Sequence, residues 1–277
     1  MIKIAGNTVE IKHFPDGALL LKEDVDSWKA NLNTNSICFE WYFENNEELA
    51  TLQFLAAHFK EQGMRIRLFM PYIPNARQDR RKNVEDIHIL KYFAKIINAM
   101  GFDSIRVLDP HSPVAEALFD RLSILSPKEY IEIAIKRVEK AEGVFPGMFY
   151  PDEGSMKRYS GMVTLPYMFG IKKRDWKTGE ISGISVEGEA EDTINSSVLI
   201  CDDICSYGGT VYYSSLKLKE LGVSNIYLYV SHCENSILKG KFGKEKVNLL
   251  DTGLIKKVYT TNSLYTGNDE RIEVISI

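Results

Sequence analysis

The sequence predicts an α/β fold of two similar halves, each a mainly parallel sheet flanked by helices. Strand and helix patterns alternate along the 277 residues, as in parallel sheets with crossover helices. One unit also recurs: AKIINAMGFDSIRVLDPH resembles SLKLKELGVSNIYLYVSH, with Gly101 opposite Gly222 and His111 opposite His232. The offset is constant at 121 residues (222 − 101 and 232 − 111), which indicates related halves. We place the two domains at 1–145 and 146–277.

The first half begins its regular pattern with a helix. Helical spacing over 48–62 puts four apolar side chains on one face, namely Leu52, Leu55, Ala56 and Phe59. The next predicted elements are a strand at 64–70, a helix at 87–100 that ends at Gly101, and a strand at 104–109. In the second half we predict a strand over the apolar run 144–150, an exposed hairpin or mobile loop at 172–192, and a strand and helix at 198–221.

Composition excludes several classes of protein. Hydrophobic residues make up 44% of the chain and charged residues 26%, as in a globular protein. The net charge is −4, which does not suggest that the chain binds nucleic acid. No apolar run is long enough to cross a bilayer, and the first residues lack the apolar core of a signal peptide. The cysteine spacing fits neither a disulfide framework nor a zinc site. We therefore expect a cytoplasmic protein with buried thiols and no membrane partner.

The segment Val198–Thr210, VLICDDICSYGGT, is the most informative part of the chain. An apolar run ends in Asp202 and Asp203 and turns through glycines into a helix. Such acids can accept hydrogen bonds from ribose hydroxyls or bind a metal, while the amides of 206–210 can hold a phosphate. The alternative is an acidic pair that only caps a strand.

Two polar segments follow strands of the first half. In Pro71–Arg81, PYIPNARQDRR, the arginines could pair with phosphates, and Gln78 and Asp79 could contact a base or ribose; a solvated turn is the alternative. Asp109-Pro110-His111 ends the next strand, where α/β folds bind ligands. His111 would ligate a metal, position a phosphate, or have only a structural role.

Two further segments lie in the second half. Asp152 follows the strand at 144–150 and is a candidate ligand of Mg²⁺ or ribose, or else a helix cap. Lys172-Lys173-Arg174 opens the polar stretch. These cations could close over transferring phosphates, or could simply be solvated.

Together these segments resemble, in order and over nearly the whole chain, the ribose-phosphate diphosphokinases, or phosphoribosyl-pyrophosphate (PRPP) synthetases. The resemblance implies two type I phosphoribosyltransferase-like halves, ATP as a substrate, Mg²⁺ as cofactor, and a homo-oligomer. His13–Gly17 resembles the family's Phe-Pro-Asp-Gly-Glu loop, which implies that Phe14 and Asp16 contact the adenine of a neighbouring subunit.

The resemblance also implies roles for the other segments. Arg77, Gln78 and Asp79 match the family's ATP-binding segment, and Asp202 and Asp203 match its ribose-binding acids. His111 and Asp152 match the family's metal ligands. Lys172 and Arg174 match its catalytic cations, and His111, beside the metal, counts as catalytic too. The loop that would bind the 5-phosphate consists of Ser206, Tyr207, Gly208, Gly209 and Thr210.

The implied reaction transfers pyrophosphate from ATP to the anomeric hydroxyl of ribose 5-phosphate, giving PRPP and AMP. The chain departs from the family pattern at Ala18, where the family has Glu, at Ser155, where it has a second Gly, and at Tyr207, where it has a small hydroxyl residue. An aromatic ring at 207 can stack on a second base or narrow the pocket.

Three alternatives stay open. The same chemistry could act on a larger acceptor such as ADP-ribose, in NAD salvage, which Tyr207 would favour. A transferase that consumes PRPP would share the Asp202–Asp203 loop but would not need the Arg77–Asp79 segment. A non-catalytic regulatory homologue would not need Lys172 and Arg174, which are both present.

Overall fold

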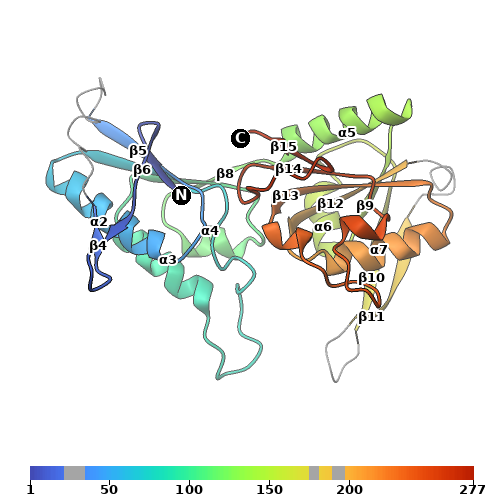
Figure 1. The fold of residues 1–277 in the computed structure, drawn as a ribbon, viewed down its shortest axis with the longest axis horizontal. Helices are drawn as coiled ribbons and strands as arrows, with labels where there is room; N and C mark the ends of the chain where they lie inside the picture. Colours follow the sequence, from blue (N-terminus) through green and yellow to red (C-terminus); the bar gives the residue numbers. More distant parts are fainter. Residues whose placement is uncertain (22–34, 175–180, 189–196) are drawn as a thin grey trace. The chain divides into compact units, whose positions relative to one another are not determined.

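The protein consists of two compact units, Met1–Leu125 and Ser126–Ile277, in a computed structural model that describes residues 1–21, 35–174, 181–188 and 197–277. Figure 1 shows that each unit is a sheet with helices. Helix α5 (Lys128–Glu142) belongs to the second unit, whereas the predicted division at 145 assigns it to the first half. The helix belongs to the second unit because its residues Ile131, Ala134 and Val138 pack into a core shared with the second sheet.

The first unit contains a six-stranded sheet in the order β2-β1-β5-β6-β7-β8. Its strands are β1 (Ile2–Ile4), β2 (Asn7–Thr8), β5 (Ser36–Trp41), β6 (Arg65–Phe69), β7 (Ser104–Leu108) and β8 (Leu122–Leu125). Strands β5 to β8 are parallel, and β1 and β2 add an antiparallel edge. Its helices are α2 (Glu47–Glu61), α3 (Ile89–Ala99) and α4 (Val114–Leu118), and β3 (Lys12–His13) pairs with β4 (Leu19–Leu20) in a separate hairpin.

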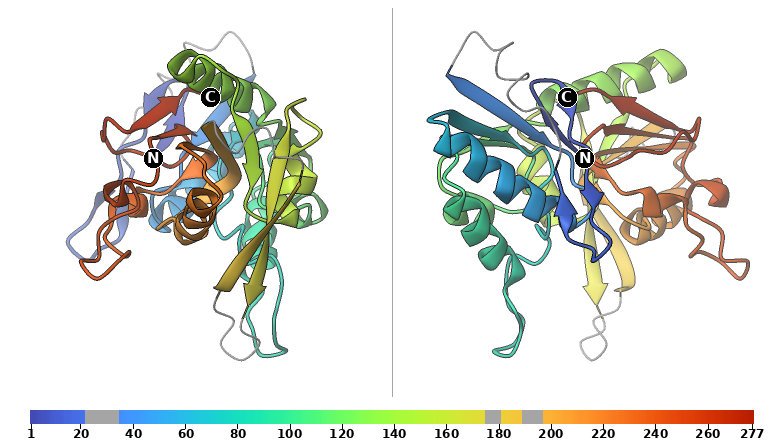
Figure 2. Two further views of the ribbon diagram at one scale, coloured as in Figure 1. Left: turned by 90° about the vertical axis from the view of Figure 1, so that its right-hand side faces the viewer. Right: turned by 60° about the vertical axis from the view of Figure 1, so that its left-hand side comes forward.

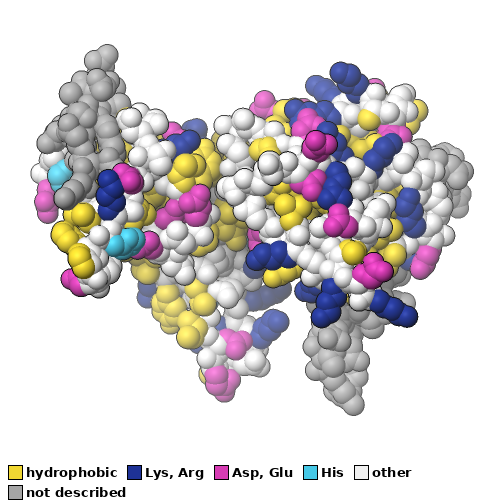
Figure 3. All heavy atoms as spheres, viewed as in Figure 1, with side chains coloured by type: hydrophobic (Ala, Val, Ile, Leu, Met, Phe, Trp, Pro, Cys, Tyr) yellow, Lys and Arg dark blue, Asp and Glu magenta, His cyan; other side chains and the backbone are white. Residues whose placement is uncertain are grey.

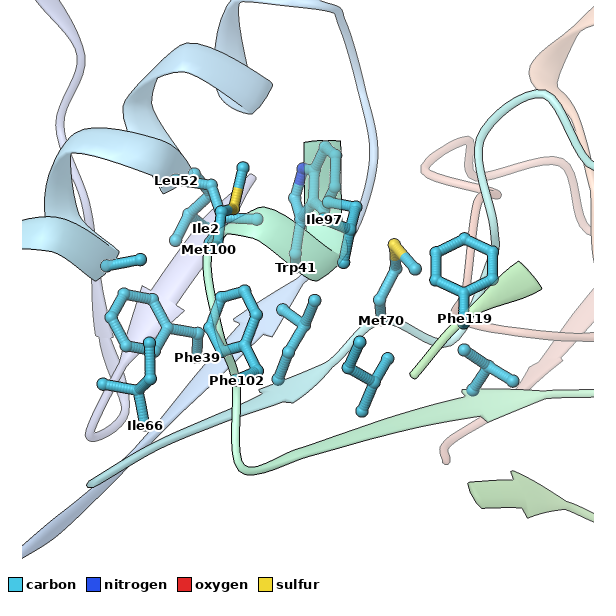
Figure 4. Packing of buried hydrophobic residues seen from close by; sticks show 14 of the residues in the cluster. Ile2, Phe39, Trp41, Leu52, Ile66, Met70, Ile97, Met100, Phe102 and Phe119 are labelled. Carbon is cyan, nitrogen blue, oxygen red and sulfur yellow. The ribbon is translucent and has the colours of Figure 1, made fainter. Parts of the chain in front are cut away.

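One hydrophobic core lies between this sheet and its helices. Ile66 and Leu68 of β6 are buried while Arg65 and Arg67, which alternate with them, are exposed, so the strand presents one apolar face. Figure 4 shows Phe39 and Phe102 side by side in this core, with ring centroids 5.7 Å apart in an edge-to-face arrangement. The four residues predicted for the buried face of α2 are all buried, which confirms that helix.

The second unit contains a seven-stranded sheet in the order β11-β10-β9-β12-β13-β14-β15. Its strands are β9 (Gly147–Tyr150), β10 (Tyr167–Arg174), β11 (Ile181–Gly188), β12 (Ser197–Cys205), β13 (Asn225–Cys233), β14 (Lys257–Thr261) and β15 (Ile272–Ile275). All neighbouring pairs are parallel except β10 with β11. Its other elements are α6 (Glu153–Tyr159), α7 (Gly209–Glu220) and the 3₁₀ segments η1 (Asn235–Leu238) and η2 (Leu250–Thr252).

Helices cover both faces of this second sheet. Leu199 and Cys201 of β12 pack in the core that holds α5 and α6, while Val198 and Ile200 pack with α7. Such alternation places the two groups of helices on opposite faces, and Figures 1 and 2 show α5 and α7 on opposite sides of the sheet. Parallel strands buried on both faces explain the continuous apolar run that begins at Val198.

The recurring unit folds in the same way in both halves. A helix ends, a glycine with positive φ follows (+68° at Gly101 and +92° at Gly222), and a parallel strand begins. The repeat does not extend to the histidines, because His111 lies beyond the end of β7 whereas His232 lies within β13.

The cysteines are thiols that are mostly buried, as predicted. Cys201, Cys205 and Cys233 are buried thiols, and Cys38 is a partly buried thiol. Among the described residues, no helix has both the length and the apolar sequence that crossing a bilayer requires.

Candidate functional site

The carboxyl end of β12 carries the two acids that the sequence singles out. Strand β12 ends at Cys205, the chain turns through Ser206–Gly208, and α7 begins at Gly209, as predicted. Asp203 is 5% exposed and Asp202 is partly buried. The flanking residues Cys201 and Cys205 are held in the core. The backbone therefore fixes both aspartates at the carboxyl end of β12.

The surroundings of Asp202 disfavour its negative charge. Burial raises the pKa of the Asp202 carboxyl, and the neighbouring Asp203 and Asp152 carboxylates raise this pKa further. The amide N–H of Asp203 donates to Asp202 Oδ1 over 3.0 Å, and Arg158 Nη1 lies 3.6 Å from Asp203 Oδ2. A ligand that brings hydroxyl donors or positive charge would relieve the repulsion among the carboxylates.

Asp152 caps helix α6. Its Oδ1 accepts hydrogen bonds from the amide N–H and the hydroxyl of Ser155, both over 3.0 Å, and the Asp152 amide N–H donates to Ser155 Oγ over 3.2 Å. Ser155, one of the departures from the family pattern, therefore completes a capping box. The structural alternative for Asp152 is confirmed, and a ligand role in addition stays a prediction.

The turn before α7 depends on glycine at one position. Gly208 has φ +85°, and a Cβ atom there would lie 2.6 Å from Leu249 Cδ2, whereas a Cβ on Gly209 would meet open space. No side chain of the described residues caps the N-terminus of α7. Because the first amides of a helix lack intrahelical acceptors, this end presents donors and a partial positive charge to an anion.

Side chains of the same unit surround this loop. The Ser236 hydroxyl donates to Glu234 Oε2 over 3.0 Å, so Ser206, 3.1 Å away, donates to Ser236 Oγ. The ring of Tyr207 is 37% exposed, and Lys241 Nζ lies 4.9 Å from its centroid. Sequence reasoning missed Lys241, although the lysine-rich stretch KGKFGKEK at 239–246 was a signal.

In the first unit, two predicted segments follow neighbouring strands. The Leu108 amide N–H at the end of β7 donates to the Pro71 carbonyl over 2.9 Å, which joins the starts of both loops. After Pro71 the chain turns at Asn75, with φ +64°, and leaves Arg77 and Gln78 exposed and Asp79 partly exposed. Asp109, by contrast, is buried with φ +39°, a conformation that costs energy in a non-glycine residue. Such strain is often found at functional sites.

The remaining predicted residues lie in two hairpins. Phe14 is 49% exposed next to a turn in which Asp16 Oδ1 accepts from the Ala18 amide N–H over 3.0 Å. Lys172 and Lys173 lie in β10, paired with β11, and the register shifts between Lys173 and Arg174. Of the two alternatives for 172–192, the hairpin is confirmed, while residues 175–180 and 189–192 lie outside the described residues.

The structure groups the candidate residues by unit. Asp152, the acidic pair and the loop after β12 belong to the second unit, and the segments after β6 and β7 belong to the first. The two expected metal ligands, His111 and Asp152, therefore lie in different units. Within either described unit, no three His, Cys, Asp or Glu side chains converge as they would around a metal ion.

No protein-family model matches the chain, but curated relatives cover most of it. Proteins named ribose-phosphate pyrophosphokinase from Thermococcus kodakarensis and Saccharolobus solfataricus are 26% and 27% identical, covering 81% and 85% of this chain and 77% and 78% of their own length. Another from Sulfurisphaera tokodaii is 26% identical over 92% of this chain and 84% of its own.

A solved structure shares the fold. The phosphoribosylpyrophosphate synthetase from Mycobacterium smegmatis superposes with a TM-score of 0.73 at 18% identity, covering 97% of this chain and 86% of that one. The family resemblance and the fold of two type I phosphoribosyltransferase-like halves, both predicted from the sequence, are therefore confirmed.

Proposed function

We propose that this divergent relative of the ribose-phosphate pyrophosphokinases transfers a pyrophosphoryl group from ATP to the anomeric hydroxyl of ribose 5-phosphate, giving PRPP and AMP. One observation carries the proposal: within nine residues, an acidic pair of one buried and one partly buried residue is followed by a left-handed glycine and an uncapped helix N-terminus. Carboxylates accept from the ribose diol, and helix amides donate to a phosphate. A sugar phosphate presents both groups.

The proposed reaction depends mainly on positioning. Asp202 and Asp203 hold the ribose hydroxyls, and Ser206–Thr210 hold the 5-phosphate, so the anomeric hydroxyl is fixed from both ends of the sugar. Its oxygen forms a bond to the β-phosphorus of ATP, the bond from that phosphorus to the α–β bridging oxygen breaks, and AMP leaves with the bridging oxygen. The hydroxyl proton passes to solvent. Arg77, Gln78 and Asp79 bind ATP.

Mg²⁺ is part of the proposal. It would be held by Asp152, His111 and the phosphates of ATP, and it would neutralise charge on the transferred group. The donor set is compatible with Mg²⁺ because the Asp152 carboxylate supplies oxygen. Activity should disappear with EDTA and return with Mg²⁺, and full activity in EDTA would rule the metal out.

Lys172 and Arg174 are proposed to meet the negative charge that develops on the transferring group. Lys172→Ala and Arg174→Ala should each lower kcat far more than they raise KM for ATP, because that charge exists only in the transition state. A loss of about 2–4 kcal/mol in transition-state stabilisation is typical of one such donor. Lys173→Ala, the neighbour between them, is the matched control. Near-normal turnover in both variants would remove these residues from the mechanism.

The proposed assembly is a dimer or larger homo-oligomer, in which Phe14 and Asp16 reach the ATP site of a neighbouring subunit. The exposure of the Phe14 ring supports this role. Sedimentation at several concentrations should show more than a monomer, and Phe14→Ala should weaken ATP binding without unfolding the chain. A fully active monomer would contradict the assembly.

A direct assay separates the candidate functions. The chain is mixed with ATP, Mg²⁺ and either ribose 5-phosphate or ADP-ribose, and AMP is measured. Acceptor-dependent AMP with ribose 5-phosphate supports the proposal. If neither acceptor gives AMP while the chain co-purifies with and regulates an active relative, the non-catalytic reading holds instead.

A second candidate keeps the chemistry and enlarges the acceptor to a compound such as ADP-ribose. The exposed ring of Tyr207, with a lysine over its face, favours it. A nucleoside beyond the phosphate could stack on this ring, whereas ribose 5-phosphate could not. Tyr207→Thr should raise kcat/KM for ribose 5-phosphate about tenfold and lower it for ADP-ribose. An unchanged ratio would show that Tyr207 does not select the acceptor.

A further inference from the structure

Residues 239–247, KGKFGKEKV, form a small hairpin that carries four lysines and one glutamate; we call it the basic hairpin. Two backbone bonds of 2.9 Å close it, from the Phe242 amide N–H to the Val247 carbonyl and from the Val247 amide N–H to the Phe242 carbonyl. A Cβ atom on Gly240 would lie 1.8 Å from the Lys246 carbonyl oxygen, so the strands approach closely there. No step of the proposed reaction uses this segment.

The hairpin and the residues after it pack on the loop Ser206–Thr210 and the first turn of α7. The buried Phe242 ring stacks on Tyr212, with centroids 4.4 Å apart and planes at 17°. Leu249, just beyond the hairpin, fills the space that a Cβ on Gly208 would occupy. Phe242 of the hairpin and Leu249 just after it therefore hold this segment against the start of α7 and the turn before it.

This packing brings one cation of the hairpin to the loop. Lys241 Nζ lies 4.9 Å from the centroid of the Tyr207 ring, within the range in which an aromatic face attracts an ammonium group. The Lys241 amide N–H donates to the Val247 carbonyl over 2.9 Å, which holds its backbone in the hairpin. Lys241 is exposed, so its ammonium group keeps access to a ligand.

The first residue of the loop is hydrogen-bonded toward a glutamate. Glu234 accepts from Ser236, and Ser236 accepts from Ser206. The proton of the Ser206 hydroxyl is thus directed toward Ser236 and away from a bound anion. The backbone amides and the Thr210 hydroxyl carry no full positive charge, and a nearby ammonium group would supply the charge that the loop's own side chains lack.

We propose that Lys241, whose ammonium group lies over the ring of Tyr207, is a substrate-binding residue that contacts the phosphate end of the acceptor. The proposal rests on the proposed function of the loop 206–210. Lys241 lies outside every segment that resembles the family. In this proposal it supplies a positive charge that helps to bind the phosphorylated sugar.

The test measures equilibrium binding of ribose 5-phosphate, and separately of ADP-ribose, to the full chain without ATP, by titration calorimetry at low and high salt. Lys241→Met should weaken binding about tenfold at low salt, equivalent to about 1.4 kcal/mol. Lys241→Arg should restore most of the affinity, and the loss should shrink at high salt because exposed charges are screened. Lys244→Met, in the exposed turn of the same hairpin, is the matched control and should bind normally.

The outcomes separate this proposal from the proposed function. Unchanged binding in Lys241→Met, or an equal loss in Lys244→Met, overturns the role of Lys241 even if the wild-type chain forms AMP. Lys241-dependent binding without AMP formation supports the role and contradicts the enzymatic proposal. If the wild-type chain binds neither ligand without ATP, the role of Lys241 fails, while AMP formation with ribose 5-phosphate still decides the proposed function.

Discussion

Asp202 combines a buried carboxyl group with two carboxylate neighbours. Its pKa in the folded chain is raised by burial first, then by Asp203 and Asp152. A carboxyl whose folded pKa lies above its unfolded value stabilises the fold at pH values below the unfolded pKa, where it is protonated in both states. That contribution is lost as the pH rises through the folded pKa. Above the unfolded pKa the unfolded chain gives up this proton more readily than the folded chain does, so the raised pKa of Asp202 opposes folding there.

Asp202→Asn should accordingly raise the free energy of unfolding at pH 7.5, by roughly 1 kcal/mol, as is common when a strained functional residue is relieved. The gain should decrease toward pH 4, and activity should be lost. Urea unfolding at both pH values measures it. Asp203→Asn is the control, because it loses the Arg158 partner 3.6 Å away and should not gain stability. A less stable Asp202→Asn at pH 7.5 would refute this account.

Residue types and spacing predicted some of the candidate positions but not their surroundings. The acidic pair and the glycines of 206–210 lie where the strand–turn–helix pattern places them. The hydrogen bonds of Asp152 with Ser155 follow from the Asp-x-x-Ser spacing, a readable cap signal. The position of Lys241 over Tyr207 arises from a contact between segments 34 residues apart (241 − 207), which no local pattern encodes.

At the scale of elements, the turn between β12 and α7 links fold and proposed chemistry. Gly208 must be glycine on two counts: its φ is +85°, and Leu249 Cδ2 lies 2.6 Å from where a Cβ would stand. Gly209 is helical and faces open space. The same turn orients the first amides of α7.

Gly208→Ala should lower the free energy of unfolding by about 1–3 kcal/mol, since it adds backbone strain to a clash. Gly209→Ala, the neighbouring control, should be nearly neutral. Thermal and urea unfolding compare them. The double variant Gly208→Ala, Leu249→Ala removes the clash but keeps the strained φ, so it separates the two causes. Equal stability of the two single glycine variants would contradict the geometry of the turn.

Long periodic elements were predictable and short ones were not. The helix at 48–62 and the strands at 64–70 and 104–109 carry enough apolar positions to define a period, and the structure contains them as α2, β6 and β7. Strands of two or three residues, such as β1 and β2, have no period to read. The assignment of α5 was also not readable, because its partners in the second sheet are distant in sequence.

At the scale of the whole molecule, the proposed chemistry is divided between the units. The predicted ATP-binding segment lies in the first unit and the ribose-phosphate residues lie in the second. Three relatives that match 81% or more of the chain are each named ribose-phosphate pyrophosphokinase. The proposed transfer requires residues of both units. Its central claim is that the group transferred from ATP is a pyrophosphoryl group.

Phosphorus NMR of a complete reaction tests that claim most directly. The chain is incubated with ATP, Mg²⁺ and ribose 5-phosphate, and each product phosphorus is assigned. The account predicts AMP and a sugar that carries an intact diphosphate on its anomeric oxygen, in equal amounts, because the β- and γ-phosphates move together. ADP with a singly phosphorylated acceptor, or AMP with free pyrophosphate and an unchanged sugar, would contradict it.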